Sequence, residues 1–196
     1  MVYNLNMFES QNMISDNVFL YKNFIDTKTL NIINDELDSM RENQWHIRDI
    51  MQPHQSPDLE SVIPVLNKIN SIIPDGFYIT QHTSVNKIIK GGSWGEHSDN
   101  ADYLNIRESA KELKDGEDFE EIENIIYGMV FYINNFDGGE LYYVNKDFAL
   151  KPEAGDLVIH GAEDDCRHKV LPVLSEKRYS YSNSVKEKIK IPRGVK

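Results

Sequence analysis

Residues 125–144 read IIYGMVFYINNFDGGELYYV, and this stretch decides the fold. Its first nine residues are almost wholly apolar, as in a strand that is buried on both faces. The cluster NNFDGG at 134–139 is a turn signal, and ELYYV at 140–144 then resumes the strand pattern. The stretch therefore predicts two strands joined by a turn.

Short strand-like runs continue on both sides of this stretch. They lie at 77–89, 156–160, 168–174 and 178–185, and turn residues separate several of them. Many short strands at turn-marked intervals are typical of a sandwich or a barrel. We therefore expect a mainly β protein with flanking helices.

The first third of the chain favours helices. Asp26 and Thr27 can cap a helix running through 29–40, whose apolar residues recur at helical spacing. A short apolar run at 18–21 precedes it and is read as a strand. A second helix is expected to begin at Ser56-Pro57 and to run toward Ile72, because proline suits the first helical position.

Composition limits the function classes. The chain has 196 residues, with 21 Lys plus Arg against 32 Asp plus Glu, so its formal net charge is −11. The acid excess disfavours nucleic acid as a partner, because phosphate contacts need a basic face. A single cysteine, Cys166, excludes an internal disulfide framework and a Cys-rich zinc site. We see no secretory signal and no apolar stretch of membrane-spanning length, so a cytoplasmic location without membrane contact is expected.

We expect one domain over 1–196. Residues 1–75 would give helical support, 76–185 the β core, and 186–196 a frayed basic tail. The acidic segment 100–124 is read as a surface insertion, either a solvated loop or a lid over the functional site. The oligomeric state is left open.

Two histidines and one aspartate stand out as metal ligands. His97 and Asp99 are two residues apart in GGSWGEHSDN, so on an extended segment their side chains point to the same side. His168, at the start of a later strand, is the candidate third ligand. Two imidazoles and one carboxylate on one face of an octahedron form the facial triad of non-haem Fe(II) oxygenases. The same ligands around zinc would instead indicate a hydrolytic site.

Arg178 strengthens the oxygenase interpretation. It follows His168 by a hairpin-like turn, which can return it to the depth of the metal. A keto acid that chelates iron leaves its far carboxylate to be bound, and a guanidinium binds such a group through two charge-assisted hydrogen bonds. His160 is a poorer ligand candidate, because no cation follows it at the same distance.

Five segments together resemble the Fe(II)/2-oxoglutarate dioxygenases, in particular the prolyl 4-hydroxylase-like branch. The resemblance covers roughly residues 17–185 and runs in order through NVFLYKNFID (17–26), GGSWGEHSDN (91–100), VFYINNFDGGELYY (130–143), KPEAGDLVIH (151–160) and HKVLPVLSEKRYS (168–180). It implies a double-stranded β-helix (jelly-roll) core. It also implies Fe(II), 2-oxoglutarate and O2 as cofactors, with ascorbate (vitamin C) as a reductant.

The resemblance assigns roles residue by residue. His97, Asp99 and His168 match the iron ligands, and Arg178 matches the residue that binds the far carboxylate of 2-oxoglutarate. Tyr132 matches a tyrosine near the cosubstrate, and would otherwise be a core aromatic. One further position is assigned less specifically.

Trp94 stands where the family often has an aromatic residue lining the substrate pocket, although a packing role fits it equally. His160 departs from the family by replacing a usual apolar residue, and Ser182-Asn183-Ser184 stand where relatives favour aromatics. These departures leave the iron ligands intact but weaken any transfer of substrate identity.

The resulting hypothesis is a 2-oxoglutarate-dependent dioxygenase that hydroxylates a C–H bond, with a prolyl residue in a peptide or protein as the favoured substrate. A free amino acid or another small metabolite is the alternative substrate class. Two other classes remain open: a cupin-like metal-binding protein without oxygenase activity, and a catalytically silent interaction module.

Overall fold

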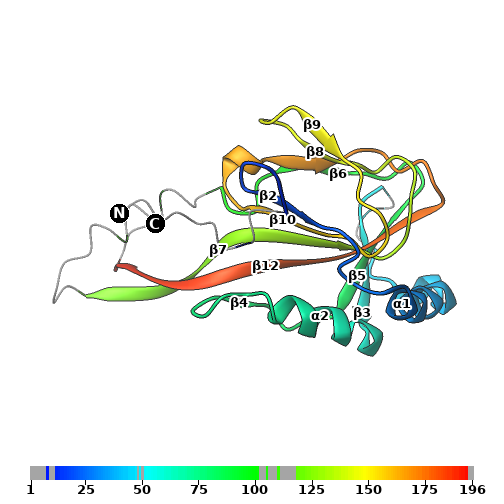
Figure 1. Cartoon of the computed structure of the whole chain (residues 1–196), viewed down its shortest axis with the longest axis horizontal. Helices are drawn as coiled ribbons and strands as arrows, with labels where there is room; N and C mark the ends of the chain where they lie inside the picture. The colour runs from blue at the N-terminus through cyan, green and yellow to red at the C-terminus, as the bar shows by residue number, and fades with distance from the viewer. Residues whose placement is uncertain are drawn as a thin grey trace.

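The computed structural model describes residues 8, 12–47, 49, 51–101, 105, 110 and 118–193. The protein is mostly β and has three layers, as Figure 1 shows: a small sheet, a large sheet, and helices on the far side of the large sheet. The two sheets form the expected double-stranded β-helix core. No helix within the described residues combines the length and the apolar character of a membrane span.

The large sheet has eight strands, and every pairing in it is antiparallel. In spatial order they are β1 (Met13–Ser15), β2 (Val18–Tyr21), β10 (Leu157–Gly161), β7 (Phe119–Tyr132), β12 (Lys177–Pro192), β5 (Ser84–Ile89) and β3 (His54–Asp58), with β4 (Tyr78–Ile79) paired to β12.

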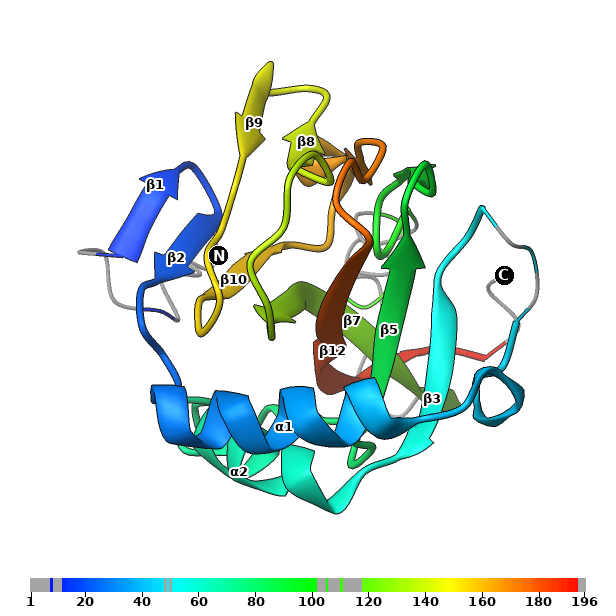
Figure 2. The same ribbon diagram turned by 90° about the vertical axis from the view of Figure 1, so that its right-hand side faces the viewer.

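The small sheet has four strands in the order β6 (Trp94–His97), β11 (His168–Val170), β8 (Leu141–Tyr143) and β9 (Phe148–Leu150). The predicted turn at 134–139 carries the chain from β7 in the large sheet to β8 in the small one. Gly138 and Gly139 both have positive φ there, +65° and +64°, which side chains other than glycine rarely adopt. The two predicted strands therefore lie in different sheets (Figure 2).

Two helices cover the outer face of the large sheet: α1 (Thr27–Ser39) and α2 (Ile63–Asn70). Asp26 caps α1 as predicted, because its carboxylate accepts the backbone N–H of Thr29 at 3.0 Å. The buried residues of both helices join the outward-facing side chains of β7, β10 and β12 in one apolar core. Short 3₁₀ turns lie at Glu42–Gln44, Glu60–Val62 and Asp164–Cys166.

The predicted start of the second helix is wrong. Ser56 and Pro57 lie in strand β3, and the helix begins at Ile63 with a proline in its first turn. The Ser56 hydroxyl accepts the backbone N–H of Val85 on β5, which ties the segment to the sheet. Strand β3 is the last in the sheet order, and an edge strand tolerates a proline that cannot donate a hydrogen bond.

The basic tail is not frayed over its described part. Residues up to Pro192 extend β12 and pair with β7 from Phe119 onward, so 119–124 are strand rather than loop. Cross-strand ion pairs join Lys186 to Glu123 at 3.0 Å and Lys188 to Glu121 at 3.2 Å. The basic tail and the acidic residues before 125, which are separate charge runs in the sequence, thus lie side by side and form ion pairs. The predicted insertion or lid spans 100–124, and residues 102–104, 106–109 and 111–117 of it lie outside the described residues.

Candidate active site

Two strands of the small sheet bring the three predicted ligands together. His97 closes β6, His168 opens β11, and the two are direct cross-strand partners. Asp99 follows His97 by two residues, and its Oδ1 lies 3.7 Å from His97 Nε2. One ligand atom from each of the three residues lies within 4.8 Å of the others. The predicted convergence of His97, Asp99 and His168 is therefore present.

Each of the two imidazoles has its Nδ1 atom beside a backbone carbonyl. His97 Nδ1 lies 2.8 Å from the carbonyl oxygen of Gly95, and His168 Nδ1 lies 3.0 Å from that of Cys166. A carbonyl only accepts hydrogen bonds, so Nδ1 carries the proton and donates it. In the neutral ring the Nε2 lone pair is then free to bind a metal. A hydrogen bond from the other ring nitrogen to a carbonyl is the usual way in which a metal-binding histidine is held in place.

The electrostatics favour a metal-binding protonation state. Burial, together with the nearby His160 ring, lowers the pKa of His168 to about 3, so this imidazole is neutral at pH 7. Burial alone would raise the pKa of Asp99, but the hydrogen bond from His160 and the neighbouring imidazoles outweigh it and hold the pKa at about 2. A neutral imidazole and an ionised carboxylate suit a divalent cation.

His160 and Tyr143 are site residues that the sequence reasoning missed. His160 Nε2 lies 3.0 Å from Asp99 Oδ2, and its Nδ1 lies 3.0 Å from the Tyr143 hydroxyl. Both residues are buried. The contacts of His160 join residues that are far apart in the chain, so no local sequence pattern predicts them. The one available signal was the polar residue at 160, where the family resemblance leads one to expect an apolar one.

The three ligand candidates share a cavity of about 310 Å³ with Arg178. Arg178 lies on β12, its side chain is buried at 2% exposure, and its Nη1 donates to the Ser180 hydroxyl at 3.1 Å. Its guanidinium carbon lies 4.9 Å from the Tyr132 ring centroid and 5.2 Å from that of Phe136. Among the described residues no carboxylate pairs with this buried cation.

Two buried polar atoms have no hydrogen-bond partner among the described residues: Arg178 Nε, and the hydroxyl of Tyr132, whose ring lies beside the guanidinium. Burial raises the pKa of Tyr132 despite the opposing charge of Arg178, so the hydroxyl keeps its proton and can donate it. Unsatisfied buried donors of this kind are costly unless an acceptor meets them. A carboxylate of a bound molecule would satisfy both.

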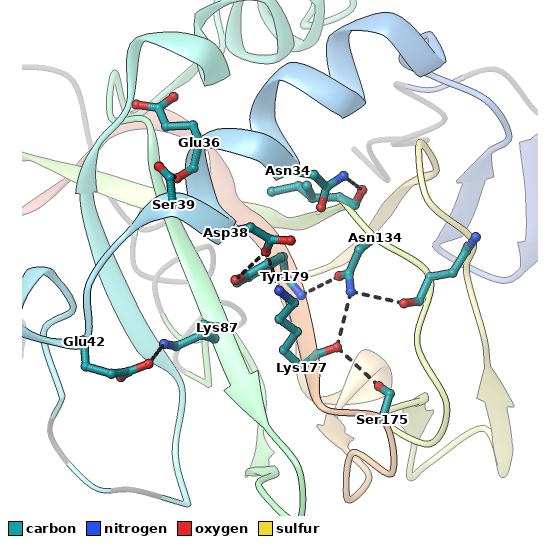
Figure 3. A network of polar contacts seen from close by, with 12 residues as sticks. Asn34, Glu36, Asp38, Ser39, Glu42, Lys87, Asn134, Ser175, Lys177 and Tyr179 are labelled. Atoms are coloured by element: carbon teal, nitrogen blue, oxygen red, sulfur yellow. Dashed lines mark hydrogen bonds and ion pairs between the residues drawn. The ribbon is translucent and has the colours of Figure 1, made fainter.

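A polar network on the outer face of the sheet fixes the backbone on either side of Arg178 (Figure 3). The Asn134 side chain accepts the Tyr179 backbone N–H at 2.7 Å and donates to the Lys177 carbonyl at 3.2 Å. The side chains of Lys177 and Tyr179 both reach Asp38 on helix α1. Because side chains alternate along a strand, holding these two outward directs Arg178 inward.

Trp94 lies at the cavity wall on β6, with 40% of its surface exposed. Its ring stacks against His97, with centroids 5.7 Å apart and planes 26° apart. The ring therefore packs against a ligand candidate and is also open to solvent, and its contact with substrate stays a prediction. Cys166 is buried, and burial raises the pKa of its thiol to about 12, which keeps the thiol protonated and unreactive.

Comparison with known proteins finds similarity in structure only. The sequence matches no protein-family model and no curated protein. Several of the similar solved structures are prolyl hydroxylases. The viral collagen prolyl hydroxylase of Paramecium Bursaria Chlorella virus-1, solved as a 2OG complex, has a TM-score of 0.64 at 12% identity and covers 89% of this chain and 99% of its own.

The Trichoplax adhaerens prolyl hydroxylase, solved with a hypoxia inducible factor peptide, has a TM-score of 0.64 at 13% identity, over 87% of this chain and 84% of its own. A 2OG-Fe(II) oxygenase family protein from Burkholderia pseudomallei has a TM-score of 0.58 at 14% identity, with the same two coverages. The chain therefore has the fold of the prolyl hydroxylases and 2OG-Fe(II) oxygenases.

Proposed function

We propose that this protein is an Fe(II)- and 2-oxoglutarate-dependent dioxygenase that hydroxylates a C–H bond. The observation that carries the proposal is the content of one cavity: two imidazoles and a carboxylate within 4.8 Å of one another, and a buried guanidinium that pairs with no carboxylate among the described residues. The fold shared with 2OG-Fe(II) oxygenases supports the same proposal.

Iron would be held by His97 Nε2, His168 Nε2 and the Asp99 carboxylate. This donor set fits a divalent ion, because its two nitrogens are oriented through carbonyl-bound Nδ1 protons and its oxygen donor is ionised. A facial triad leaves positions for a chelating keto acid and dioxygen. When bound, iron supplies the oxidative decarboxylation of 2-oxoglutarate to succinate and CO2 that drives the hydroxylation.

The chain's other residues bind the cosubstrate and exclude water. Arg178 would receive the far carboxylate of 2-oxoglutarate, with the Tyr132 hydroxyl as a further donor and Ser180 fixing the guanidinium. Apolar side chains between the two sheets, among them Leu141 and Val170, line the same cavity. A dry, preorganised pocket protects reactive species from solvent.

The test of the reaction class is an anaerobic titration of the protein with Fe(II) and 2-oxoglutarate. A visible metal-to-ligand charge-transfer band is expected for the wild type and not for Asp99→Ala. Admission of oxygen should then release succinate. A cupin-like metal protein without oxygenase activity would bind the metal but release no succinate, so metal binding by the wild type with neither the charge-transfer band nor succinate would favour that alternative.

The favoured substrate is a prolyl residue in a peptide or protein. An exposed aromatic, Trp94, at the cavity wall suits stacking on a pyrrolidine ring. One protein of the same fold is a prolyl hydroxylase solved with a peptide. Mass spectrometry of proline-containing peptides should reveal one added oxygen with the wild type and none with Asp99→Ala. Oxygen added to a free amino acid but to no peptide would favour the small-molecule alternative.

A further inference from the structure

A hydrogen-bonded chain of three side chains runs through the interior beside the three ligand candidates. Tyr143 lies on β8 of the small sheet, His160 on β10 of the large sheet, and Asp99 just after β6. The Tyr143 hydroxyl is 3.0 Å from His160 Nδ1, and His160 Nε2 is 3.0 Å from Asp99 Oδ2. The chain thus connects both sheets to one oxygen of the carboxylate.

The chemistry of the three groups fixes the direction of these bonds. An ionised carboxylate only accepts, so His160 Nε2 carries a proton and donates it to Asp99. In the tautomer of His160 that carries its proton on Nε2, Nδ1 accepts a hydrogen bond from the Tyr143 hydroxyl. Every polar atom of the buried imidazole has a partner, so the ring is held in one orientation and one tautomer.

The space for this contact is provided by Gly128. It is the direct cross-strand partner of His160 on β7. A Cβ atom at position 128 would lie 1.8 Å from Asp99 Oδ2 and 2.6 Å from His160 Nε2. The carboxylate and the imidazole therefore meet over a strand position where any side chain would collide with both.

We propose that His160, fixed by Tyr143, is a positioning residue that binds Asp99 Oδ2 and leaves only Oδ1 for the metal. The inference rests on the proposed function and deepens it. A carboxylate with one oxygen engaged elsewhere binds a metal through the other, and so occupies one coordination position rather than two. His160 would therefore help to keep positions free for the cosubstrate and dioxygen.

His160 could alternatively be a ligand itself. The contacts speak against this, because its Nε2 proton points at the Asp99 carboxylate and its Nδ1 faces Tyr143. Within the described residues, the group that converges tightly enough to hold an ion is His97, Asp99 and His168, without His160.

A pair of amide substitutions separates the two nitrogens of His160. In His160→Gln the side-chain amide reaches the place of Nε2 and can still donate to Asp99. In His160→Asn the amide is shorter and reaches only the place of Nδ1, next to Tyr143. Both variants are polar, so neither adds an apolar group beside the carboxylate. His82→Asn, at a cavity histidine that does not contact the three ligand candidates, is the matched control.

The readout is the affinity of the metal-free protein for Co(II), measured by calorimetry without cosubstrate. Loss of an outer partner of a metal ligand typically weakens binding about 10- to 100-fold. We expect a weakening of that size in His160→Asn, and an affinity within about 3-fold of wild type in His160→Gln and in the control. The Co(II) absorption spectrum should change in His160→Asn, because its intensity depends on coordination number.

The inference is overturned if His160→Asn binds Co(II) as tightly as the wild type. It is also overturned if His160→Gln loses as much affinity as His160→Asn, since the donated hydrogen bond would then not be what matters. A wild-type protein that binds no Co(II) at all would instead contradict the proposed function, so the two failures are distinguishable.

Discussion

Asp99 is the most constrained residue of the site. Its carboxylate is ionised although it is largely buried, because His160 donates to one of its oxygens and the other faces His97. The constraint extends to the backbone opposite, where only hydrogen fits at position 128. Ligand type and spacing predicted Asp99 from the sequence, but the contact with His160 could not be predicted, because it depends on how three separate strands pack.

Gly128→Ala is expected to abolish divalent metal binding. The new methyl group would overlap Asp99 Oδ2 and push the carboxylate away from the other ligands. Gly95→Ala is the control, because a Cβ there meets no atom of the part of the chain that the structure describes within 4 Å, although the residue lies two positions before His97. Calorimetric titration with Co(II) checks both variants, and unimpaired binding by Gly128→Ala would contradict the geometry of the site.

Arg178→Lys is expected to weaken 2-oxoglutarate binding while leaving Co(II) affinity unchanged. Lysine keeps the charge but loses the planar fork, and one charge-assisted hydrogen bond is worth about 1.5–3 kcal/mol, or about 10- to 150-fold in affinity. The measurement is the 2-oxoglutarate dissociation constant of the metal-loaded protein. Arg193→Lys, at an exposed arginine, is the control. Equal affinities in the two variants would mean that the carboxylate binds elsewhere.

At the scale of elements, the side chains of strand β12 point alternately into the cavity and toward the helices. Arg178, Ser180 and Ser182 line the cavity, whereas Tyr179 and Tyr181 pack on the helix side. The sequence predicted this strand up to position 185, because its aromatic residues have high β propensity. It did not predict the continuation KEKIKIP, whose charges suggested solvent until the acidic partner strand supplied the opposite charges.

Glu163, the residue directly before the 3₁₀ turn at Asp164–Cys166, carries a pH-sensitive carboxyl group. Burial raises the pKa of Glu163, which also accepts a hydrogen bond from Asn17 at 2.9 Å. Because the pKa of Glu163 is higher in the folded protein than in the unfolded chain, protonated Glu163 contributes to stability. This contribution is fully present below about pH 4.5, the pKa in the unfolded chain, and is lost as the pH rises through the pKa in the folded protein.

Glu163→Gln should therefore be more stable than the wild type at pH 7 and equal to it at pH 4. Glutamine keeps the acceptor for Asn17 without the buried charge. Urea unfolding at both pH values measures the difference, and Glu60→Gln at an exposed carboxylate controls for the loss of one negative charge. If Glu163→Gln were no more stable than the wild type at pH 7, burial of the Glu163 charge would not destabilise the folded protein, and the prediction would be contradicted.

At the scale of the whole molecule, the large sheet packs against a different layer on each of its two faces. Its inner face meets the small sheet and holds the site, and its outer face buries the apolar side of α1 and α2. The layer pattern was predictable from the alternation of apolar residues and from the family resemblance. The strand at 54–58 was not, because HQSPD has little β propensity and becomes a strand only through its pairing with β5.

Ile33→Ala should lower the free energy of unfolding by about 2–5 kcal/mol, the usual cost of a large-to-small change in a core. Ile33 is fully buried at the contact of α1 with the sheet, whereas its neighbour Ile32 is 53% exposed. Ile32→Ala is therefore the control and should change stability by less than about 0.5 kcal/mol. Chemical denaturation checks both, and equal effects would show that α1 does not pack as described.

The central claim is that one cavity holds a metal at His97, Asp99 and His168 and a dicarboxylic cosubstrate at Arg178. A crystal structure of the protein grown anaerobically with Mn(II) and 2-oxoglutarate tests it most directly. The account predicts the ion on the two Nε2 atoms and Asp99 Oδ1, with the far carboxylate of 2-oxoglutarate on the Arg178 guanidinium. Manganese bound by other residues, or 2-oxoglutarate bound away from Arg178, would contradict it.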